Sequence, residues 1–380
     1  MTPYIILYLL LLLTFVFERN SVSDRVKSKI IYFWVIIFTL FRGLRWNTGT
    51  DWNQYLQVFL DSDIANIIGY DRGFGFMETG YMFLNASIGL MGKEYTIFLL
   101  LTNLFVLISY ARFATTNSNT PIYVFIVLMF STQFFPVRIG IAVAVILWGL
   151  SYFSEKRYLR VIVYTLLATS IHASAIIFLP IYFACFYRKI PTLLALSCAI
   201  AAFVLTQSNT INTLLSEASF IYDIVDEQSA TKFEHYLDYT ETKMTQGLSS
   251  HLNSVIFILT LGIFGPLVKK LNRDESNTKK VNYDFIYNMY FIFVILGIVF
   301  APENMQNLKR IQNYFMFAFP ILFSSAISYG NLKRPDLRII FVLIFIMYLV
   351  FRFYSLLFSG FPDSHFPYIS IFDSNQNRYT

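Results

Sequence analysis

Charged residues are scarce in this 380-residue chain. They make up 14% of it and hydrophobic residues 56%, whereas an average soluble domain holds about 25% charged residues. The apolar residues are gathered in long runs such as 4–17, 30–41 and 339–350. A helix that crosses a ~30 Å hydrocarbon core needs about 20 mostly apolar residues, and runs without period-two alternation favour helices. The composition excludes an ordinary soluble domain and predicts an all-α polytopic membrane protein.

Cysteine, metal-binding patterns and nucleotide motifs are also scarce or missing. The two cysteines fall in apolar runs, as core packing would place them, and the four histidines lack metal-ligand spacing. No P-loop, GxGxxG, GxSxG or HExxH sequence occurs. The net charge of +6 is typical of a membrane protein that collects Lys and Arg in cytoplasmic loops. We therefore expect no metal, no cofactor and no nucleic-acid partner.

Hydropathy predicts about twelve transmembrane helices in a single integral membrane domain, 1–380. The first run lacks a basic leader region and a small-residue cleavage site, so we expect it to be retained as a span. The stretch 158–187 is too long for one upright helix, and we interpret it as two spans that turn near His172. The predicted spans are 3–17, 30–42, 94–111, 120–135, 139–153, 158–171, 173–187, 190–206, 251–268, 283–300, 310–328 and 338–357.

Charge in the connecting segments predicts the orientation. The segments placed inside by alternation hold 18 of the 29 Lys and Arg residues, as the positive-inside rule requires. Both termini are then expected outside. The predicted inside segments are 18–29, 112–119, 154–160, 188–189, 269–282 and 329–338.

Two predicted outer segments are longer than simple connections need to be. Segment 43–93 contains the helix-like stretches 52–60 and 81–90, and we expect these to be interfacial or re-entrant helices. Segment 207–250 is acidic and amphipathic, and it is a candidate lid.

A string of aromatic, basic and acidic residues runs from Arg42 to Tyr55, at the start of the first outer segment. Gly49 permits a tight turn, and Asp51 can cap a helix that begins at Trp52. A binding role is the alternative, because Trp52 and Tyr55 share a helix face and aromatic rings stack on sugar rings. Interfacial aromatic belts use the same residue types, so these residues alone leave both interpretations open.

Glu78 and His172 are two further candidates. Glu78 either stabilises the start of the helix-like stretch after it or serves as a functional carboxylate, because an ionisable group in the outer leaflet is costly unless it is used. His172 lies among apolar neighbours at a predicted turn, where its side chain needs a polar partner. A lone histidine is more often structural than functional.

Arginines on the predicted outer side run against the positive-inside rule. Arg138 precedes the span 139–153, and Arg310 precedes Asn313 and Tyr314 at helical spacing. An arginine can simply extend to the interface. A diphosphate at the outer leaflet would also explain these charges, because guanidinium binds phosphate through two parallel hydrogen bonds.

The chain resembles the EpsG family of Wzy-type oligosaccharide repeat-unit polymerases, which build bacterial exopolysaccharide, capsule or O-antigen. The resemblance is carried by four motifs in order, spanning residues 45 to 314. The string from Arg45 to Tyr55, followed by Glu78-Thr-Gly-Tyr81, is similar to the early Arg–Gly-Thr-Asp–Tyr signature and its glutamate. Arg138-Ile-Gly-Ile-Ala142 is similar to Arg-Gln-Gly-Ile-Ala with Ile139 at the polar position, Ile171-His172-Ala-Ser174 to Ile-His-Xaa-Ser, and Arg310-Ile-Gln-Asn-Tyr314 to the late Arg–Tyr motif.

The resemblance implies a membrane glycosyltransferase that joins undecaprenyl-diphosphate-linked repeat units at the outer face of the bacterial cytoplasmic membrane, without metal or nucleotide. Lipid-linked oligosaccharide, membrane lipid, a flippase and a chain-length regulator would be its partners. Two alternatives remain open: a flippase or transporter of the same lipid-linked glycan, and a membrane acyltransferase that modifies glycans. We hypothesise that Asp51 or Glu78 is the base with His172 in reserve, that Arg45, Arg138 and Arg310 bind the diphosphate, and that Trp52, Tyr55 and Tyr314 bind sugar or acceptor.

Overall fold

The structure is a computed structural model, and its regular elements are helical throughout the part that it describes. One antiparallel bridge joins Arg45 to Ser370. Two compact units form, one from Met1–Ile176 with Ile327–Thr380 and one from Ile177–Ala326. The described residues are 2–18, 21–49, 51–68, 77–132, 134–135, 137–150, 158–186, 188–208, 248–274, 279, 281–301, 306–333, 335–358 and 366–373.

The first unit is built from long apolar helices and two shorter helices from segment 43–93. Residues that favour helix ends set their limits: Ser23 accepts the amide hydrogen of Val26 at the start of α2, and Pro121 occupies the first turn of α6. The elements are α1 (Thr2–Leu13), η1 (Thr14–Phe17), α2 (Asp24–Gly43), α3 (Trp52–Asp61), η2 (Ile64–Asn66), α4 (Thr79–Gly89), α5 (Tyr95–Asn117), α6 (Pro121–Ser131), α7 (Arg138–Gly149), α8 (Tyr158–Ile171) and α18 (Pro335–Phe358).

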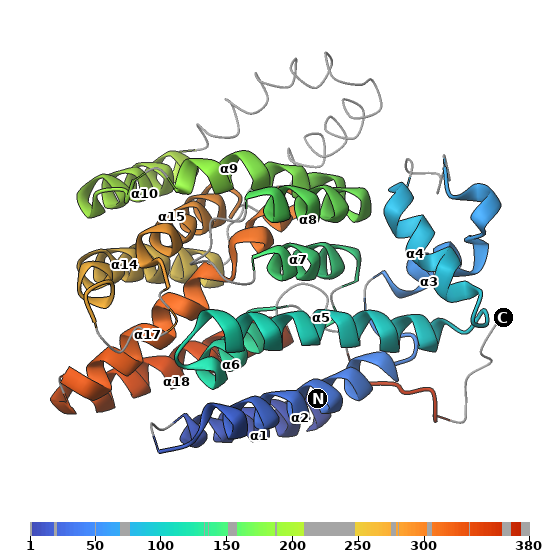
Figure 1. Ribbon diagram of the computed structural model, residues 1–380, viewed down its shortest axis with the longest axis horizontal. Coiled ribbons are helices and arrows are strands. Elements are labelled where there is room, and N and C mark those ends of the chain that lie inside the picture. Colours follow the sequence, from blue (N-terminus) through green and yellow to red (C-terminus); the bar gives the residue numbers. More distant parts are fainter. Residues whose placement is uncertain are drawn as a thin grey trace, which may run out of the picture. The chain divides into compact units, whose positions relative to one another are not determined.

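Packing in this unit is centred on α5 and α6. Helix α5 packs against α2, α6 and α7, and α7 packs against α8 (Figure 1). Helix α6 also contacts α1, α2 and α18, while α4 contacts both α3 and α8. Since α6 is apolar and buried along its whole length, these helices surround it as a core element.

The second unit has α15 at its centre. Helix α15 packs against α9, α10, α14 and η5, and α10 packs against α14. Two elements cross the boundary between the units, namely η3 (Ala173–Ile177) and α17 (Ala318–Lys333). The other elements are α9 (Phe178–Cys185), α10 (Thr192–Gln207), α14 (Leu248–Leu271), α15 (Tyr283–Val299), α16 (Gln306–Lys309) and η5 (Arg310–Phe315).

The predicted all-helical class is confirmed for the described residues, and every predicted span contains helical structure. Among the described residues, two helices, Tyr95–Asn117 and Ser250–Leu271, are long and apolar enough to cross a membrane. The count of about twelve spans stays a prediction. The predicted helix-like stretches 52–60 and 81–90 form α3 and α4, and their interfacial placement stays a prediction; most of the candidate lid, residues 209–247, lies outside the described residues.

Connections predicted to lie inside the cell contact one another in the first unit. The Arg112 guanidinium lies 4.6 Å from the centre of the Trp148 ring, and the Nη2 of Arg160 donates to the Trp148 carbonyl at 3.0 Å. The carboxylate of Glu18 meets the amides that begin α6. These contacts agree with the predicted alternation of inside and outside connections along the chain.

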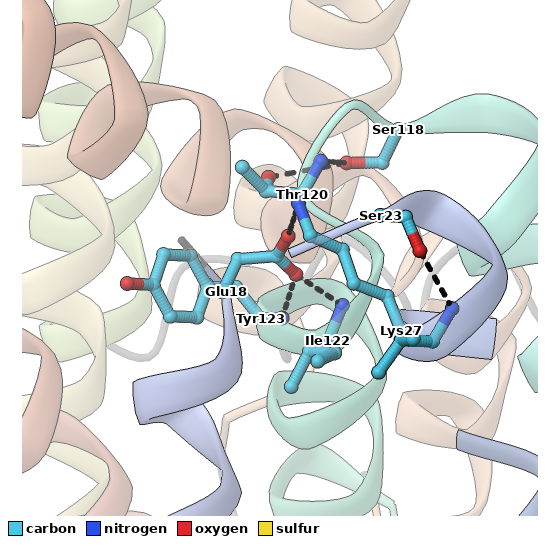
Figure 2. Close-up of polar contacts among 8 residues, drawn as sticks. Glu18, Ser23, Lys27, Ser118, Thr120, Ile122 and Tyr123 are labelled. Carbon is cyan, nitrogen blue, oxygen red and sulfur yellow. Dashed lines mark hydrogen bonds and ion pairs between the residues drawn. The ribbon is translucent and has the colours of Figure 1, made fainter. Parts of the chain in front are cut away.

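Figure 2 shows Glu18 with the amides that begin α6 and with Lys27, with which it forms a buried ion pair. The two charged groups lie 2.7 Å apart, and the side chain of Glu18 is 0% exposed. The same carboxylate accepts the amide hydrogens of Ile122 at 2.5 Å and Tyr123 at 3.4 Å, where the positive end of the helix dipole favours an anion. Burial raises the pKa of Glu18, and Lys27 opposes that rise. The pair fixes η1 and α2 to the start of α6.

The C-terminal segment 366–373 pairs with the chain that follows α2, and both are predicted outside. Trp46 donates its amide hydrogen to Ile369 at 2.9 Å, and Ile371 donates to Leu44 at 3.0 Å. The Tyr368 hydroxyl donates to a carbonyl near the end of α2 at 2.7 Å. These bonds hold segment 366–373 against the start of the predicted outer segment 43–93.

Candidate functional site

The turn between α2 and α3 gives the first motif its shape. Gly49 has a φ of +115°, and Asn47 has a φ of 43°, a region that glycine and asparagine enter most readily. Helix α3 begins at Trp52, as predicted, with Asp51 at the N-cap position. The Asp51 side chain makes no capping hydrogen bond and is exposed. Its carboxylate therefore does not have the structural role that capping would give it.

Arg45 is enclosed by this turn. Its side chain is 3% exposed, and its Nη1 donates to the Thr48 carbonyl at 3.1 Å. The guanidinium lies 4.2 Å from the centre of the Phe135 ring and 5.3 Å from that of Trp52, distances at which a cation and an aromatic face attract. Burial lowers the pKa of Arg45 to about 10, so the group stays charged at neutral pH.

The Glu78-Thr-Gly-Tyr81 segment, the motif that begins at Arg138 and the motif that contains His172 meet at Glu78. Its Oε2 lies 2.5 Å from the Nη1 of Arg138 at the start of α7. Its Oε1 accepts the amide hydrogen of Ala173, just after α8, at 3.1 Å. The same Arg138 nitrogen lies 3.0 Å from the sulfur of Met77. Both carboxylate oxygens are therefore engaged, and the carboxylate holds the start of α7 to the turn after α8.

Gly80 explains how α4 reaches that turn. A Cβ added at Gly80 would lie 2.7 Å from the carbonyl oxygen of Ser170 and still closer to its hydroxyl. Only a residue without a side chain allows this approach, because the obstacle includes backbone. The glycine of the Glu78-Thr-Gly-Tyr81 motif thus sets the distance between α4 and α8.

His172 lies beside this cluster and is partly buried. Its Nδ1 lies 3.1 Å from the hydroxyl of Ser174, which provides the polar partner that the sequence required. On the other side, the ring of Tyr55 in α3 lies 6.0 Å from that of Tyr81 in α4. Tyr55 also contributes electrostatically at Arg138. The structure therefore brings Tyr55, Glu78, Arg138 and His172 into one region.

The remaining candidates are placed differently. Trp52 is 4% exposed and packs edge-on against Trp46 and Tyr95, at ring-centre distances of 5.5 and 5.1 Å. Tyr314 is 0% exposed and lies in the second unit, as does Arg310, which is exposed. Neither Trp52 nor Tyr314 offers a free ring face in this structure. The first unit alone supplies the cluster described above.

Sequence reasoning missed three side chains that belong to this region. Ser174 contacts His172, Met77 contacts Arg138, and Arg42 is almost completely buried one turn before Arg45. Ser174 stood in its motif and Met77 stood beside Glu78, so adjacency was an available signal. Arg42 opened the string that the sequence singled out, but it was given no role, because a basic residue in the last turn of a helix is ordinary. Among the described residues no group of three or more His, Cys, Asp or Glu side chains gathers as metal ligands do.

A model of the EpsG family matches residues 28–370, nearly the whole chain. The chain belongs to the EpsG family. This family is Wzy-type polymerase-like, and the matched range contains every candidate residue discussed above. No curated protein and no solved structure matches the chain. As a member of the EpsG family with apolar helices throughout, the protein is a membrane protein of polysaccharide biosynthesis.

Proposed function

We propose that this EpsG-family protein polymerises undecaprenyl-diphosphate-linked repeat units at the outer face of the bacterial cytoplasmic membrane. The observation that supports this best is the Glu78 carboxylate, which binds Arg138 at 2.5 Å and the amide of Ala173 at 3.1 Å. Three motifs that are far apart in the sequence converge there. An active site needs residues from distant parts of the chain to converge. Helix ends with separate structural roles do not need to converge.

The reaction is a glycosyl transfer with a diphosphate leaving group. The bond between the first sugar carbon of the growing chain and its lipid diphosphate breaks. A hydroxyl of the incoming lipid-linked repeat forms the new bond to that carbon and gives its proton to a base. Undecaprenyl diphosphate leaves with the bonding electrons, so positive charge near its oxygens lowers the barrier.

The contacts divide the roles among the candidates. Glu78 has both oxygens engaged, so we assign it to positioning Arg138 and the turn that carries His172. Asp51 is exposed and makes no capping bond, so we assign it the role of base. Tyr55 and His172, which are partly buried beside the cluster, orient the sugar hydroxyls. No step requires a metal or a nucleotide.

Arg310 of the second unit is retained as a further ligand for the phosphate of the lipid-linked substrate, whereas Tyr314 is not. Arg310 is exposed at the start of η5, where its guanidinium is available to a phosphate. Tyr314 is buried four residues later, and it fixes this helix in the unit.

The decisive experiment is the glycan ladder of a deletion strain that carries variants of the gene. Glu78→Gln keeps the size of the side chain but removes its charge, and Arg138→Lys keeps the charge but removes the planar fork. Loss of one preorganised charge contact costs about 10²–10³ in rate. We therefore expect single repeats and little long polymer from both variants, with normal protein levels. The matched control is Arg25→Lys, at an exposed arginine in the predicted inside segment 18–29, and it should give normal polymer.

The ladder also separates the alternatives. A flippase or transporter would leave no repeat outside when it is inactivated, and an acyltransferase would leave chain length unchanged. Long polymer of normal length from Glu78→Gln would contradict the proposal.

A further inference from the structure

Arg42 is an almost completely buried cation that has no carboxylate partner among the described residues. The residue is 1% exposed, and the Tyr8 hydroxyl is the one polar side chain recorded as interacting with its guanidinium, whose Nη1 and Nη2 otherwise make no hydrogen bond to the described part of the chain. Arg45, three residues later, has a buried Nε without a partner. A guanidinium carries five N–H donors, and a buried donor without a hydrogen bond destabilises the fold. Two neighbouring buried arginines with unsatisfied N–H donors therefore need an explanation.

The surroundings of the two arginines contain tyrosines and phenylalanines. Arg42 lies 5.9 Å from the centre of the Phe38 ring, and its charge acts on the hydroxyls of Tyr8 and Tyr110. The Tyr8 hydroxyl can supply at most one acceptor, because its own hydrogen goes to the Met129 carbonyl at 3.4 Å. The groups that act electrostatically on Arg45 are tyrosines and Arg42 itself, namely Tyr95, Tyr4, Arg42 and Tyr368.

Other buried cations of this unit are neutralised by a carboxylate. Lys27 has Glu18 at 2.7 Å, and Arg138 has Glu78 at 2.5 Å. Arg138 keeps one idle nitrogen, its Nε, but its charge is balanced. No described carboxylate takes that place for Arg42 or Arg45. Burying two like charges without a counter-ion is strongly unfavourable, so an anion from outside the chain would balance them.

We propose that Arg42 and Arg45 together form the site for the diphosphate of the lipid-linked repeat, and that Arg138 does not. This inference rests on the proposed function and adds to it the residue Arg42. The arginines offer idle N–H groups from two guanidinium planes, which suits an anion with several oxygens. Aromatic walls and exclusion of water strengthen the attraction. A polyprenyl diphosphate is the ligand class, and the phosphate of an ordinary phospholipid is the other source of the same chemistry.

Entry to the site passes through the chain after α2. Segment 366–373 is bonded to that chain through Trp46 and Leu44, and Tyr368 stacks on Phe41 at a ring-centre distance of 4.7 Å. Since Arg42 is 1% exposed, the diphosphate reaches it when this segment moves away from the turn. The apolar lipid tail then stays along the lipid-facing side of α2.

The test measures binding to the full-length protein in phosphatidylcholine nanodiscs. The probes are undecaprenyl diphosphate, undecaprenyl monophosphate and phosphatidylglycerol, and the readout is the affinity of each by native mass spectrometry. We expect the diphosphate to bind at least about tenfold more tightly than the other two. Arg42→Gln should weaken it by at least about tenfold, because one bidentate contact is lost, and Arg42→Lys should have an intermediate effect.

Arg112→Gln is the matched control. Arg112 is a half-buried arginine of the same unit that stacks on an aromatic ring, but it lies near the predicted inside end of α5. Its variant should bind the diphosphate as the unaltered protein does. A thermal unfolding scan of each variant separates loss of folding from loss of binding, and Arg42→Lys covers the case in which Arg42→Gln does not fold.

Two results would overturn the inference. In the first, a folded Arg42→Gln or Arg42→Lys protein binds the diphosphate within about twofold of the unaltered protein. In the second, phosphatidylglycerol binds as tightly as the diphosphate, which would assign the site to bulk lipid. Neither result touches the proposed polymerase reaction, which fails separately if Glu78→Gln gives a normal glycan ladder.

Discussion

At the scale of single residues, buried charge is handled in two ways in the first unit. Lys27 and Arg138 are each neutralised by a glutamate, whereas Arg42 and Arg45 are surrounded by aromatic rings. The first arrangement stabilises the fold when both partners are present, because a lone buried charge is strongly unfavourable. The second leaves positive charge available to a ligand. The two kinds of arginine should therefore respond differently to substitution.

Lys27→Met tests the structural kind of ion pair. It leaves Glu18 buried without its ammonium partner, and we expect a loss of about 3–5 kcal/mol in the free energy of unfolding. The double variant Glu18→Gln with Lys27→Met should recover most of that loss, because no unpaired charge remains. Thermal unfolding of the purified protein in detergent measures both.

The pH dependence of Lys27→Met has a definite sign. Burial raises the pKa of Glu18, and Lys27 lowers it, so removing Lys27 raises that pKa further. A carboxyl whose pKa is raised by folding stabilises the folded state at low pH and loses this effect as the pH rises. The deficit of Lys27→Met should thus be smaller at about pH 5 than at about pH 8. An equal deficit at both values would show that Glu18 is not the group responsible.

Asp51→Asn tests the assigned base. Asparagine keeps the shape of the side chain but cannot accept a proton, and loss of a general base costs about 10²–10⁴ in rate. We expect the purified variant to bind lipid-linked repeats but not to join them. Asp61→Asn removes another exposed carboxylate of α3 and should keep normal polymerisation. Equal activity of the two variants would remove Asp51 from the mechanism and leave His172 as the base.

At the scale of elements, the site depends on how closely α4 approaches the end of α8. Glu78 precedes α4 and bonds to the residue after His172, so a small displacement of α4 separates the carboxylate from its partners. The sequence predicted both helices correctly. It gave no means of predicting that they touch, because their approach is set by contact at Gly80.

Gly80→Ala should separate the two helices. The added Cβ meets the carbonyl oxygen of Ser170 at 2.7 Å, and such overpacking costs about 1–3 kcal/mol. Misplacement of a catalytic contact by about 1 Å can cost about 10²-fold in rate, so we expect strong loss of polymer. Gly89→Ala is the control in the same helix, because its Cβ would meet only the flexible Lys93 side chain, at 3.5 Å or more. Normal polymer from Gly80→Ala would show that this approach is not required.

At the scale of the whole molecule, contacts between connections agree with the alternation of spans. In the first unit, predicted inside connections meet at Trp148 and at the start of α6, and predicted outside segments meet at the turn after α2. In the second unit, Lys189 donates to the Gly265 carbonyl at 2.6 Å, near two predicted inside segments. The orientation itself comes from charge in the loops and stays a prediction.

Cysteine labelling in intact cells tests the orientation. In a background without Cys185 and Cys198, an impermeant maleimide should label Asn53→Cys in α3 from outside. It should label Lys29→Cys in α2 only after the membrane is made permeable. Both positions are exposed at the surface of the protein, so cover by other parts of the chain does not distinguish them. Labelling of Lys29→Cys in intact cells would invert the topology and contradict a site on the outer face.

The sequence by itself determined the class, the helices and the family, because runs of apolar residues and short motifs are local properties. It also fixed the start of α3 at Trp52 and the special backbone at Gly49. Only the tertiary structure decided which charges are balanced. The engagement of Glu78 with Arg138, across 60 residues, and the lack of such a partner for Arg42 depend on the packing of helices that are distant in the chain. A charge pattern along the sequence cannot reveal them, since the electrostatic energy of a side chain depends on its neighbours in space.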